Sequence, residues 1–180
     1  TGIGIEASLT GHLVFATLHT NSAPESIIRL LDMGMDPFNF ADAMLGILAQ
    51  RLGKRLCKDC KVAYHPDAEE IKRLLHEYSE ELTNTESWKK DPKGSMEAIY
   101  KEWVSRYAKD GKFTLYKAKG CPACSDTGYR GRVGLHELLV GTDPVKKLIQ
   151  EKARVAEILA CALNEGMRTL KMDGIEKIMQ

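Results

Sequence analysis

Two Cys-x-x-Cys pairs, Cys57 with Cys60 and Cys121 with Cys124, carry the clearest chemical signal in this 180-residue chain. Each pair can place two sulfurs on one side of a tight turn, and two such turns supply the four thiolates of a tetrahedral zinc site. The spacing therefore predicts one tetracysteine metal site, which clips the base of the segment 61–120 that separates the pairs. The alternative interpretation is four reduced cysteines that serve as small core residues.

Three further observations define the chemistry expected of these cysteines. Four sulfurs leave no open coordination position, so the predicted zinc is structural and performs no catalysis. A redox role would need one pair near a helix N-terminus with a lowered thiol pKa, and the presence of a second pair argues against it. His65 is a possible substitute ligand, although four cysteines suffice, and Cys161 stands apart from both pairs as an expected small core residue.

A second candidate site lies near the beginning of the chain. Residues 13–18 form a short apolar run bounded by polar residues, which predicts a strand buried on both faces, as in a parallel sheet. His19, Thr20 and Asn21 follow at the carboxyl end of that strand, where open α/β sheets bind ligands. Residues 3–9 fit either a strand or the end of a helix.

The remaining pattern predicts mostly helices. Ser22 and Glu25 form a capping box for a helix that ends at Gly34, and Asp36 starts a second helix whose apolar stripe continues to Leu52 before Gly53 ends it. Segment 61–120 is polar and predicts two amphipathic helices around a loop at 83–95, with Trp103 in a small core. The sequence further predicts a strand at 113–116, a glycine-containing loop at 125–134, a strand or short helix at 135–140, and short helices from 143 onward.

Composition limits the possible classes. The chain is 43% hydrophobic and 28% charged, which allows a buried core, and it has neither a transmembrane run of about 18 apolar residues nor a signal-peptide pattern. With 26 basic and 25 acidic residues the net charge is +1, so we expect no nucleic-acid partner, and the acidic content of residues 67–91 also argues against a nucleic-acid-binding zinc ribbon. Five cysteines, four of them paired, indicate a reducing compartment.

Several segments together resemble the type II secretion and type IV pilus assembly branch of the secretion ATPases. Residues 9–21 (LTGHLVFATLHTN) resemble the histidine box of that family. The other matching segments are Ala49-Gln50-Arg51-Leu52 running into Leu56-Cys57, Gly120-Cys121 through Cys124 to Thr127-Gly128-Tyr129-Arg130-Gly131-Arg132, and Gly166-Met167-Arg168-Thr169-Leu170 with Asp173-Gly174. The resemblance covers nearly the whole chain, and segment 61–120 is its least recognisable part.

The resemblance implies the C-terminal part of a hexameric, RecA-like motor that hydrolyses ATP with Mg²⁺ and drives pilin or pseudopilin polymerisation. It implies a cytoplasmic location, peripheral to the bacterial inner membrane, with the other subunits and an inner-membrane platform protein as partners. The implied domains are 1–56, the end of an α/β, RecA-like ATPase domain with a parallel sheet; 57–124, an inserted and largely helical tetracysteine zinc subdomain; and 125–180, a C-terminal helical region. The phosphate-binding Walker A pattern G-x-x-x-x-G-K-[ST] is absent from these 180 residues, so we expect this chain alone to be inactive.

Residue roles follow from combining this resemblance with the predicted strand. His19 could sense the γ-phosphate through a hydrogen bond, with Thr20 and Asn21 as polar partners, or it could simply bind loop carbonyls. His12 precedes the strand, roughly 20 Å from its other end, and so acts either at a subunit boundary or as a turn cap. Arg51 and Arg55 are candidates for contact with nucleotide or a neighbouring subunit, and Arg130 and Arg132 are candidates for a partner surface.

Two interpretations remain open at this point. The basic residues around the first cysteine pair are either a solvated surface beside a negatively charged thiolate site or a contact for phosphate or a partner. The alternative to a motor enzyme is a zinc-stabilised interaction module, in which region 51–132 docks a membrane platform protein.

Overall fold

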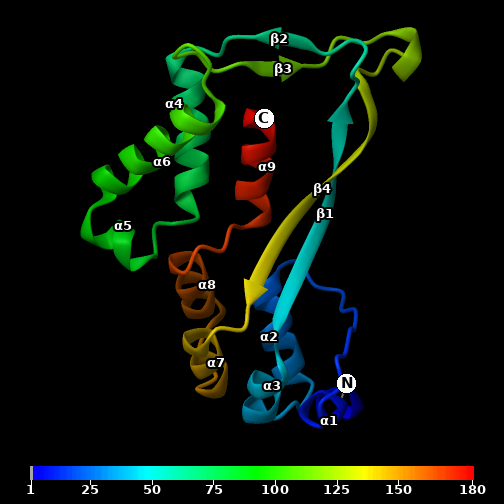
Figure 1. The fold of residues 1–180 in the computed structure, drawn as a ribbon, viewed down its shortest axis with the longest axis vertical. Helices are drawn as coiled ribbons and strands as arrows, with labels where there is room; N and C mark the ends of the chain where they lie inside the picture. The colour runs from blue at the N-terminus through cyan, green and yellow to red at the C-terminus, as the bar shows by residue number, and fades with distance from the viewer. Residues whose placement is uncertain (1) are drawn as a thin grey trace. The chain divides into compact units, whose positions relative to one another are not determined.

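The computed structural model describes residues 2–180, which form two compact units (Figure 1). Unit 1 contains the chain up to Ala49 together with Glu137–Arg168, and unit 2 contains Gln50–His136 together with Thr169–Gln180. The helices are α1 (Gly2–Leu9), α2 (Ala23–Asp32), α3 (Pro37–Ala43), α4 (Ala68–Glu80), α5 (Glu86–Lys90), α6 (Pro92–Tyr107), α7 (Asp143–Gln150), α8 (Val155–Asn164) and α9 (Leu170–Met179), with a 3₁₀ turn, η1 (Pro122–Cys124). The strands are β1 (Gly46–Leu56), β2 (Val62–Tyr64), β3 (Leu115–Lys117) and β4 (Tyr129–Val140).

Unit 1 is a group of short helices packed around one end of the β1–β4 pair. Ser22 is the N-cap of helix α2 as predicted, with its Oγ accepting from the Glu25 amide, which is one of the two bonds of the predicted capping box. The helix ends before Gly34, whose φ of 88° suits a residue without a side chain. Helix α3 packs against α1 and α7, and α8 packs against α2 and α7. The fully buried side chains of this unit include Ile27, Leu139, Val145, Ile149 and Ile158.

The second predicted helix is only partly correct. Helix α3 ends at Ala43, and Leu48 and Leu52 of the predicted stripe lie on strand β1. Leu48 and Leu52 are four residues apart, a spacing that fits one face of a helix and, because four is even, also fits one face of a strand. Both side chains are more than half exposed, which agrees with the outward face of a strand.

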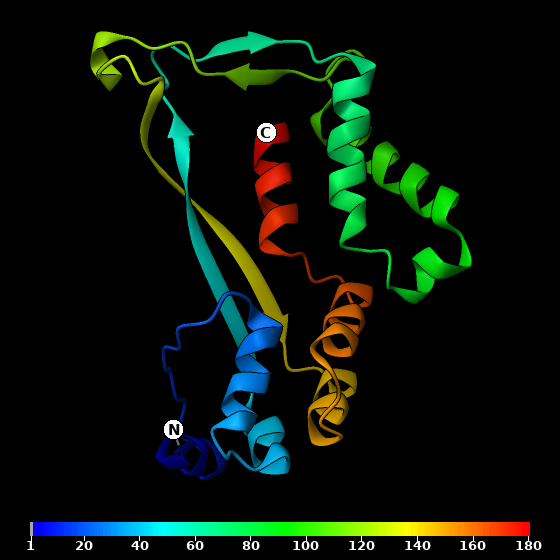
Figure 2. The same cartoon turned by 180° about the vertical axis from the view of Figure 1, so that it is seen from behind.

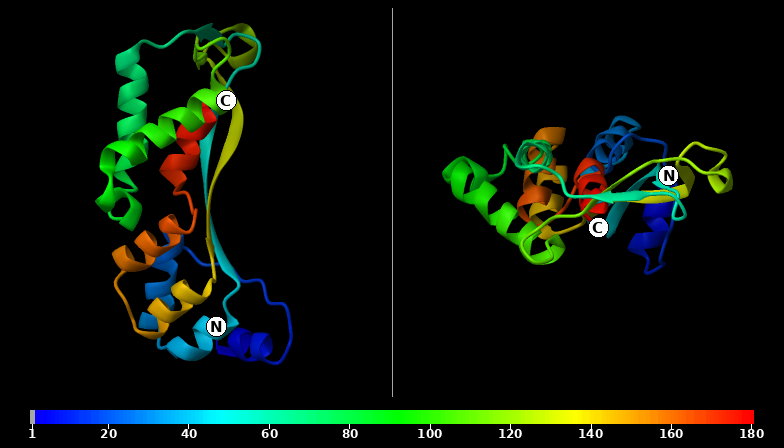
Figure 3. Two further views of the ribbon diagram at one scale, coloured as in Figure 1. Left: turned by 60° about the vertical axis from the view of Figure 1, so that its left-hand side comes forward. Right: turned by 90° about the horizontal axis from the view of Figure 1, so that it is seen from above.

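Strands β1 and β4 form a two-stranded sheet and run in opposite directions, as their arrows in Figure 1 show. The left view of Figure 3 shows the two strands side by side. At one end of the pair the Gly141 amide donates to the Leu45 carbonyl over 2.9 Å. Strand β4 begins at Tyr129, so the predicted loop at 125–134 is wrong from Tyr129 onward, and the uncertain segment 135–140 is strand. Two glycines of this segment, Gly128 and Gly131, have positive φ angles of 76° and 79°.

Unit 2 contains a second two-stranded sheet and the helices α4, α5, α6 and α9. Strands β2 and β3 pair antiparallel, with Ala63 opposite Tyr116. Helix α4 packs against α6 and α9, and Figures 1 and 2 show α9 beside α4. Trp103 is almost fully buried and meets Tyr78 edge-on with the ring centroids 5.3 Å apart, which confirms the predicted small core. The predicted loop at 83–95 contains the short helix α5 and the start of α6.

The predicted strand at 13–18 is the main correction. These residues are neither helix nor strand in the described part of the chain, and Phe15 is 88% exposed. An apolar run of this kind is a stable strand only with neighbouring strands and with layers on both faces, and residues 2–180 supply neither. The fold is thus mixed helix and strand, and the expected RecA-like parallel sheet is not present among the described residues. The expected domain boundaries at 56/57 and 124/125 stay predictions.

Candidate metal centre and histidine segment

The four paired cysteines converge as their spacing predicts. Their Sγ atoms all lie within 4.8 Å of one another. The separations are 3.9 Å between Cys57 and Cys121, 3.8 Å between Cys60 and Cys124, and 3.8 Å between Cys121 and Cys124. A tetrahedron with zinc–sulfur bonds of about 2.3 Å has sulfur–sulfur edges of about 3.8 Å, whereas a disulfide needs about 2.05 Å. The cluster therefore has the dimensions of a zinc site rather than of a disulfide.

Tight backbone turns position the two pairs. The Lys61 amide donates to the Cys57 carbonyl over 2.9 Å, and the Asp126 amide donates to the Cys121 carbonyl over the same distance. The turns are joined by a bond from the Cys57 amide to the Gly128 carbonyl, 2.9 Å long. Gly128 has a φ of 76°, and a Cβ there would stand 2.6 Å from the Ala118 Cβ. Only glycine fits this position, because a side chain would be strained and would also clash.

Backbone amides also bind the sulfur of Cys124 directly. The amides of Cys121 and Gly128 donate to this Sγ over 3.3 and 3.2 Å. Burial raises the pKa of Cys124, but these two amides and the neighbouring thiols outweigh it and lower the pKa to about 7. Burial raises the pKa of Cys121, and the sulfurs of Cys60 and Cys124 raise it further, to about 12. Cys124 is thus the sulfur best prepared to be a thiolate, and its amide partners would orient it as a metal ligand.

Two other groups considered as ligands lie outside the cluster. His65 Nδ1 is 2.8 Å from the Phe113 carbonyl oxygen, and the histidine lines a cavity of about 530 Å³ beside α4. Cys161 belongs to α8 in unit 1. Among the described residues, the four paired cysteines are the group of histidine, cysteine and carboxylate side chains close enough to hold an ion.

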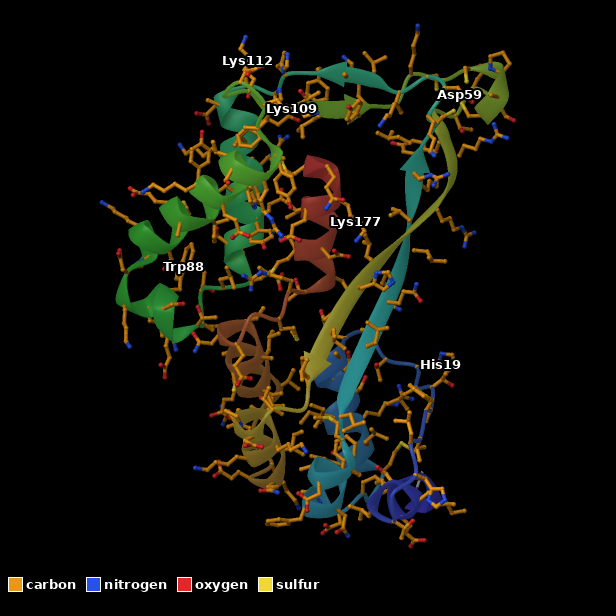
Figure 4. All side chains as sticks on the ribbon, viewed as in Figure 1. His19, Asp59, Trp88, Lys109, Lys112 and Lys177 are labelled. Atoms are coloured by element: carbon orange, nitrogen blue, oxygen red, sulfur yellow. The ribbon has the colours of Figure 1, made fainter. Side chains whose placement is uncertain are left out.

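Several cations around the cluster have local partners. Lys61 Nζ lies 3.7 Å from the Tyr116 ring centroid, and Lys54 Nζ lies 5.9 Å from that of Tyr129. Arg130 pairs with Asp59 over 3.7 Å, but both side chains are more than half exposed, so this pair adds little stability. Figure 4 shows Asp59 at the first cysteine turn. The contacts favour the interpretation of a solvated surface whose positive charge balances the thiolates.

The histidine segment, His19–Ser22, lies outside helix and strand and leads directly into α2 (Figure 4). Arg29 Nη1 donates to the His19 carbonyl over 2.7 Å, and Thr20 Oγ1 donates to the Ser22 carbonyl over 3.3 Å. The His19 side chain is exposed, as is Asn21. The structure thus places His19, Thr20 and Asn21 together at the start of a helix rather than at the end of a strand.

His12 has local contacts at the end of α1. Its Nδ1 lies 3.2 Å from the Ala7 carbonyl oxygen and 3.4 Å from Thr10 Oγ1. These contacts favour the capping role over a role at a subunit boundary. Arg51 and Arg55 are exposed on β1 in the part of that strand that belongs to unit 2. Their contact with nucleotide or a neighbouring subunit stays a prediction.

A buried carboxylate was missed in the sequence. Glu137 lies in β4 within unit 1, and one of its oxygens accepts from the Ala23 amide over 2.8 Å. It is 3% exposed. The available signal was a single acidic residue inside the apolar run of residues 135–140, since buried carboxylates are rare unless they have partners.

Comparisons with known proteins cover the whole chain. The family model described as type II/IV secretion system protein matches residues 1–180. The chain is 40% identical over 178 residues to the type IV pilus assembly ATPase PilB of Thermus thermophilus, covering 99% of this chain and 17% of that protein. It is 38% identical over 178 residues to the type II secretion system ATPase E of Vibrio cholerae, covering 99% of this chain and 29% of that protein.

The chain thus spans between 17% and 29% of the length of these two relatives. A third, the type IV pilus assembly ATPase PilB of Myxococcus xanthus, is 38% identical over 177 residues, which is 98% of this chain and 26% of that protein. Within residues 2–180, none of the helices combines the length and the apolar character needed to cross a membrane.

Proposed function

Because the chain belongs to the type II/IV secretion system protein family, we propose that it is the C-terminal part of a hexameric ATPase that powers the assembly of pilins or pseudopilins. The observation that carries this proposal is the match of nearly the whole chain to proteins named as secretion or pilus assembly ATPases. The proposed motor is cytoplasmic and peripheral to the bacterial inner membrane, and the platform protein of the same machine is its proposed partner.

The exposed apolar segment 13–18 supports the RecA-like part of this proposal. Leu13 is 68% exposed and Phe15 is 88% exposed, an arrangement that a protein surface does not favour. In the longer protein, strands from other parts of the chain would pair with this segment and bury both of its faces. The histidine segment would then follow the carboxyl end of a parallel strand, where nucleotides bind in open α/β sheets.

In the proposed motor, the chain contributes to nucleotide sensing rather than to phosphate binding. His19 presents an exposed imidazole that could hydrogen-bond the γ-phosphate, and the Arg29 contact to its carbonyl fixes its backbone. The Walker A loop and the Mg²⁺ ligands that phosphoryl transfer needs would come from the rest of the longer protein. The 180-residue chain alone is therefore proposed not to hydrolyse ATP.

The cluster of Cys57, Cys60, Cys121 and Cys124 would hold structural zinc. When bound, the metal would supply folding free energy, because an unfolded chain has no preformed site. The chain's own residues set the positions of the ligands: the Gly128 carbonyl and amide bind Cys57 and Cys124, and the two cysteine turns close the base of segment 61–120. The partner contact is proposed to involve region 51–132, which contains both cysteine turns.

The experiment compares ATP hydrolysis by the longer protein with hydrolysis by its His19→Ala and His76→Ala variants. His76 is the matched control, because it is an exposed histidine on α4 that only approaches Glu80 on the same helix. We expect His19→Ala to lower kcat at least about tenfold, as is usual when a hydrogen bond to developing charge is lost, and His76→Ala to leave it within about twofold. Equal kcat for wild type and His19→Ala, or ATP turnover by the 180-residue chain alone, would contradict the assignment.

A further inference from the structure

Glu137 is a buried acidic residue whose side chain is held by a hydrogen bond to a distant part of the chain. Its side chain is 3% exposed, and its carboxylate accepts from the Ala23 amide, 114 residues away in the sequence. Burial of a carboxylate is costly unless hydrogen bonds compensate for lost hydration. The hydrogen bond to the Ala23 amide therefore offsets part of the free-energy cost of burying the carboxylate. It also links β4 to α2.

The carboxylate completes the N-terminus of α2. Ala23 and Glu25 are the first-turn residues with amide hydrogens, because Pro24 between them has none. Ser22 Oγ accepts from the Glu25 amide over 3.3 Å, and Glu137 accepts from the Ala23 amide over 2.8 Å. A negative carboxylate at this end is also favoured by the helix dipole. These amides are thus already bound by protein groups and are not available to an incoming phosphate.

The helix start and the histidine segment are adjacent in the chain. Ser22 caps α2 and is the last residue of the segment, so a shift of Ala23 is transmitted to His19 through only three intervening residues. The Arg29 contact to the His19 carbonyl joins the same helix to the other end of the segment. Whatever holds the first turn of α2 therefore also restrains the backbone from which the imidazole of His19 projects.

We propose that Glu137 is a positioning residue that fixes the histidine segment for ATP hydrolysis by binding the Ala23 amide. Glu137 touches neither nucleotide nor metal in this proposal, and its influence passes through the α2 N-terminus. The inference rests on the proposed function, because it assigns His19 to nucleotide sensing. The attachment of the segment by Glu137 can nevertheless be measured without any nucleotide.

The first measurement is amide hydrogen exchange of the 180-residue chain, with Glu137→Ala, Glu137→Gln and Glu25→Gln compared with wild type. Glu137→Ala removes the acceptor, and we expect exchange at Ala23 and at the Glu25 amide, which Ser22 binds in the same turn, to become at least about tenfold faster. Glu137→Gln keeps the shape and a neutral acceptor, so we expect a smaller increase of about threefold. Glu25→Gln removes a carboxylate from the same helical turn without removing the acceptor of Ala23, and should leave exchange within about twofold.

The second measurement is the steady-state kinetics of ATP hydrolysis for the same variants in the longer protein. We expect kcat to fall in the same order as exchange rises, with Glu137→Ala below Glu137→Gln below wild type, and KM for ATP to stay within about twofold. If Glu137→Ala does not fold, the Gln variant alone must show both changes. Unchanged exchange in the Glu137 variants would overturn the positioning role, and faster exchange with unchanged kcat would overturn its link to hydrolysis. Failure of the proposed function would differ from both, because the wild-type longer protein would then show no hydrolysis while the exchange result could still stand.

Discussion

At the scale of single residues, the sulfur of Cys124 shows most clearly how this chain prepares a metal ligand. Two backbone amides, those of Cys121 and Gly128, point at this sulfur. Burial raises the pKa of the thiol, but these amides and the neighbouring thiols outweigh burial and lower the pKa to about 7. Amide hydrogen bonds to a thiolate orient it and reduce its charge, as outer partners do in many metal sites. The turn that contains η1 and Gly128 therefore supplies the hydrogen bonds that orient the Cys124 sulfur.

This arrangement predicts that Cys124→Ser abolishes stoichiometric metal binding. A hydroxyl is a poor zinc ligand at neutral pH, and its loss would leave three thiolates in a site built for four. We expect elemental analysis of the purified chain to give about one zinc per wild-type chain and less than about 0.2 per Cys124→Ser chain. Cys161→Ser is the matched control and should retain about one zinc, because Cys161 lies outside the cluster. Equal zinc content in all three proteins would contradict the tetracysteine site.

Tyr64 gives a prediction for high pH. Its hydroxyl donates to Glu70 over 2.8 Å, and this bond, followed by burial, raises the pKa of Tyr64 above its usual value of 10.0. A raised pKa for a group that ionises to an anion means that its stabilising contribution is complete below the unfolded pKa and is lost as pH rises through the folded pKa. Tyr64→Phe should therefore lower the free energy of unfolding by about 1 kcal/mol at pH 8. This difference between wild type and variant should shrink above about pH 10.

Urea unfolding at several pH values measures that difference. Tyr107→Phe is a useful comparison, because burial is the first cause of the raised pKa of Tyr107 rather than a hydrogen bond to a carboxylate. A cost for Tyr64→Phe that stayed constant from pH 8 to about pH 11 would show that the Glu70 bond is not its source.

At the scale of elements, local signals predicted most helices and failed where an element depends on distant partners. Ser22 and Asp36 cap α2 and α3 as expected, because a cap needs only its own first turn. Strand β1 was assigned to a helix because the spacing of Leu48 and Leu52 fits both structures. Strand β1 forms because it pairs with β4, which lies far along the chain. The local sequence of residues 44–53 therefore gives no indication of this pairing.

The candidate site divides in the same way. The four cysteines were predictable because their type and spacing have one dominant meaning, and the structure brings them together. The position of His19 after a strand was not confirmed, because the layers that would bury residues 13–18 are not among the described residues. Glu137 could not be predicted as a cap for α2, because a bond that spans 114 residues leaves no local pattern.

Helix α9 supplies a prediction about how unit 2 is held together. Asp173 accepts from the His136 amide over 2.8 Å and from Lys177 over 2.6 Å, with its side chain 21% exposed. Asp173→Ala should destabilise the unit by about 1–2 kcal/mol, because it removes the acceptor of a strand amide and the partner of a lysine. Lys171→Ala is the control, since its pair with Glu80 is exposed and should contribute less than about 0.5 kcal/mol.

Urea unfolding followed by tryptophan fluorescence can measure both variants, because Trp103 is buried in the same unit. Equal costs for Asp173→Ala and Lys171→Ala would mean that the bond to β4 contributes no more than a surface ion pair.

At the scale of the whole molecule, the two units differ in what stabilises them. Unit 1 has a core that includes Ile27 and Ile158 from helices and Leu139 from β4, and it contains none of the four clustered cysteines. Unit 2 contains all four, and segment 61–120 within it has a short ladder, β2 with β3, and a small core around Trp103. A metal that joins Cys57 and Cys60 to Cys121 and Cys124 would close this long segment and reduce the conformational freedom of its unfolded state.

Metal removal should therefore affect the two units unequally. We expect chelation of zinc under reducing conditions to raise amide exchange in β2, β3, α4 and α6 by at least about tenfold, because structural zinc is a large part of the folding free energy of small metal-bound segments. Exchange in α2, α7 and α8 should stay within about twofold, since their contacts lie within unit 1. Cys124→Ser should reproduce the chelated pattern without chelator, and adding zinc should reverse chelation but not the substitution. Equal increases in amide exchange in both units would show that the metal stabilises the chain as one cooperative body. No increase in either unit would show that the metal does not stabilise unit 2.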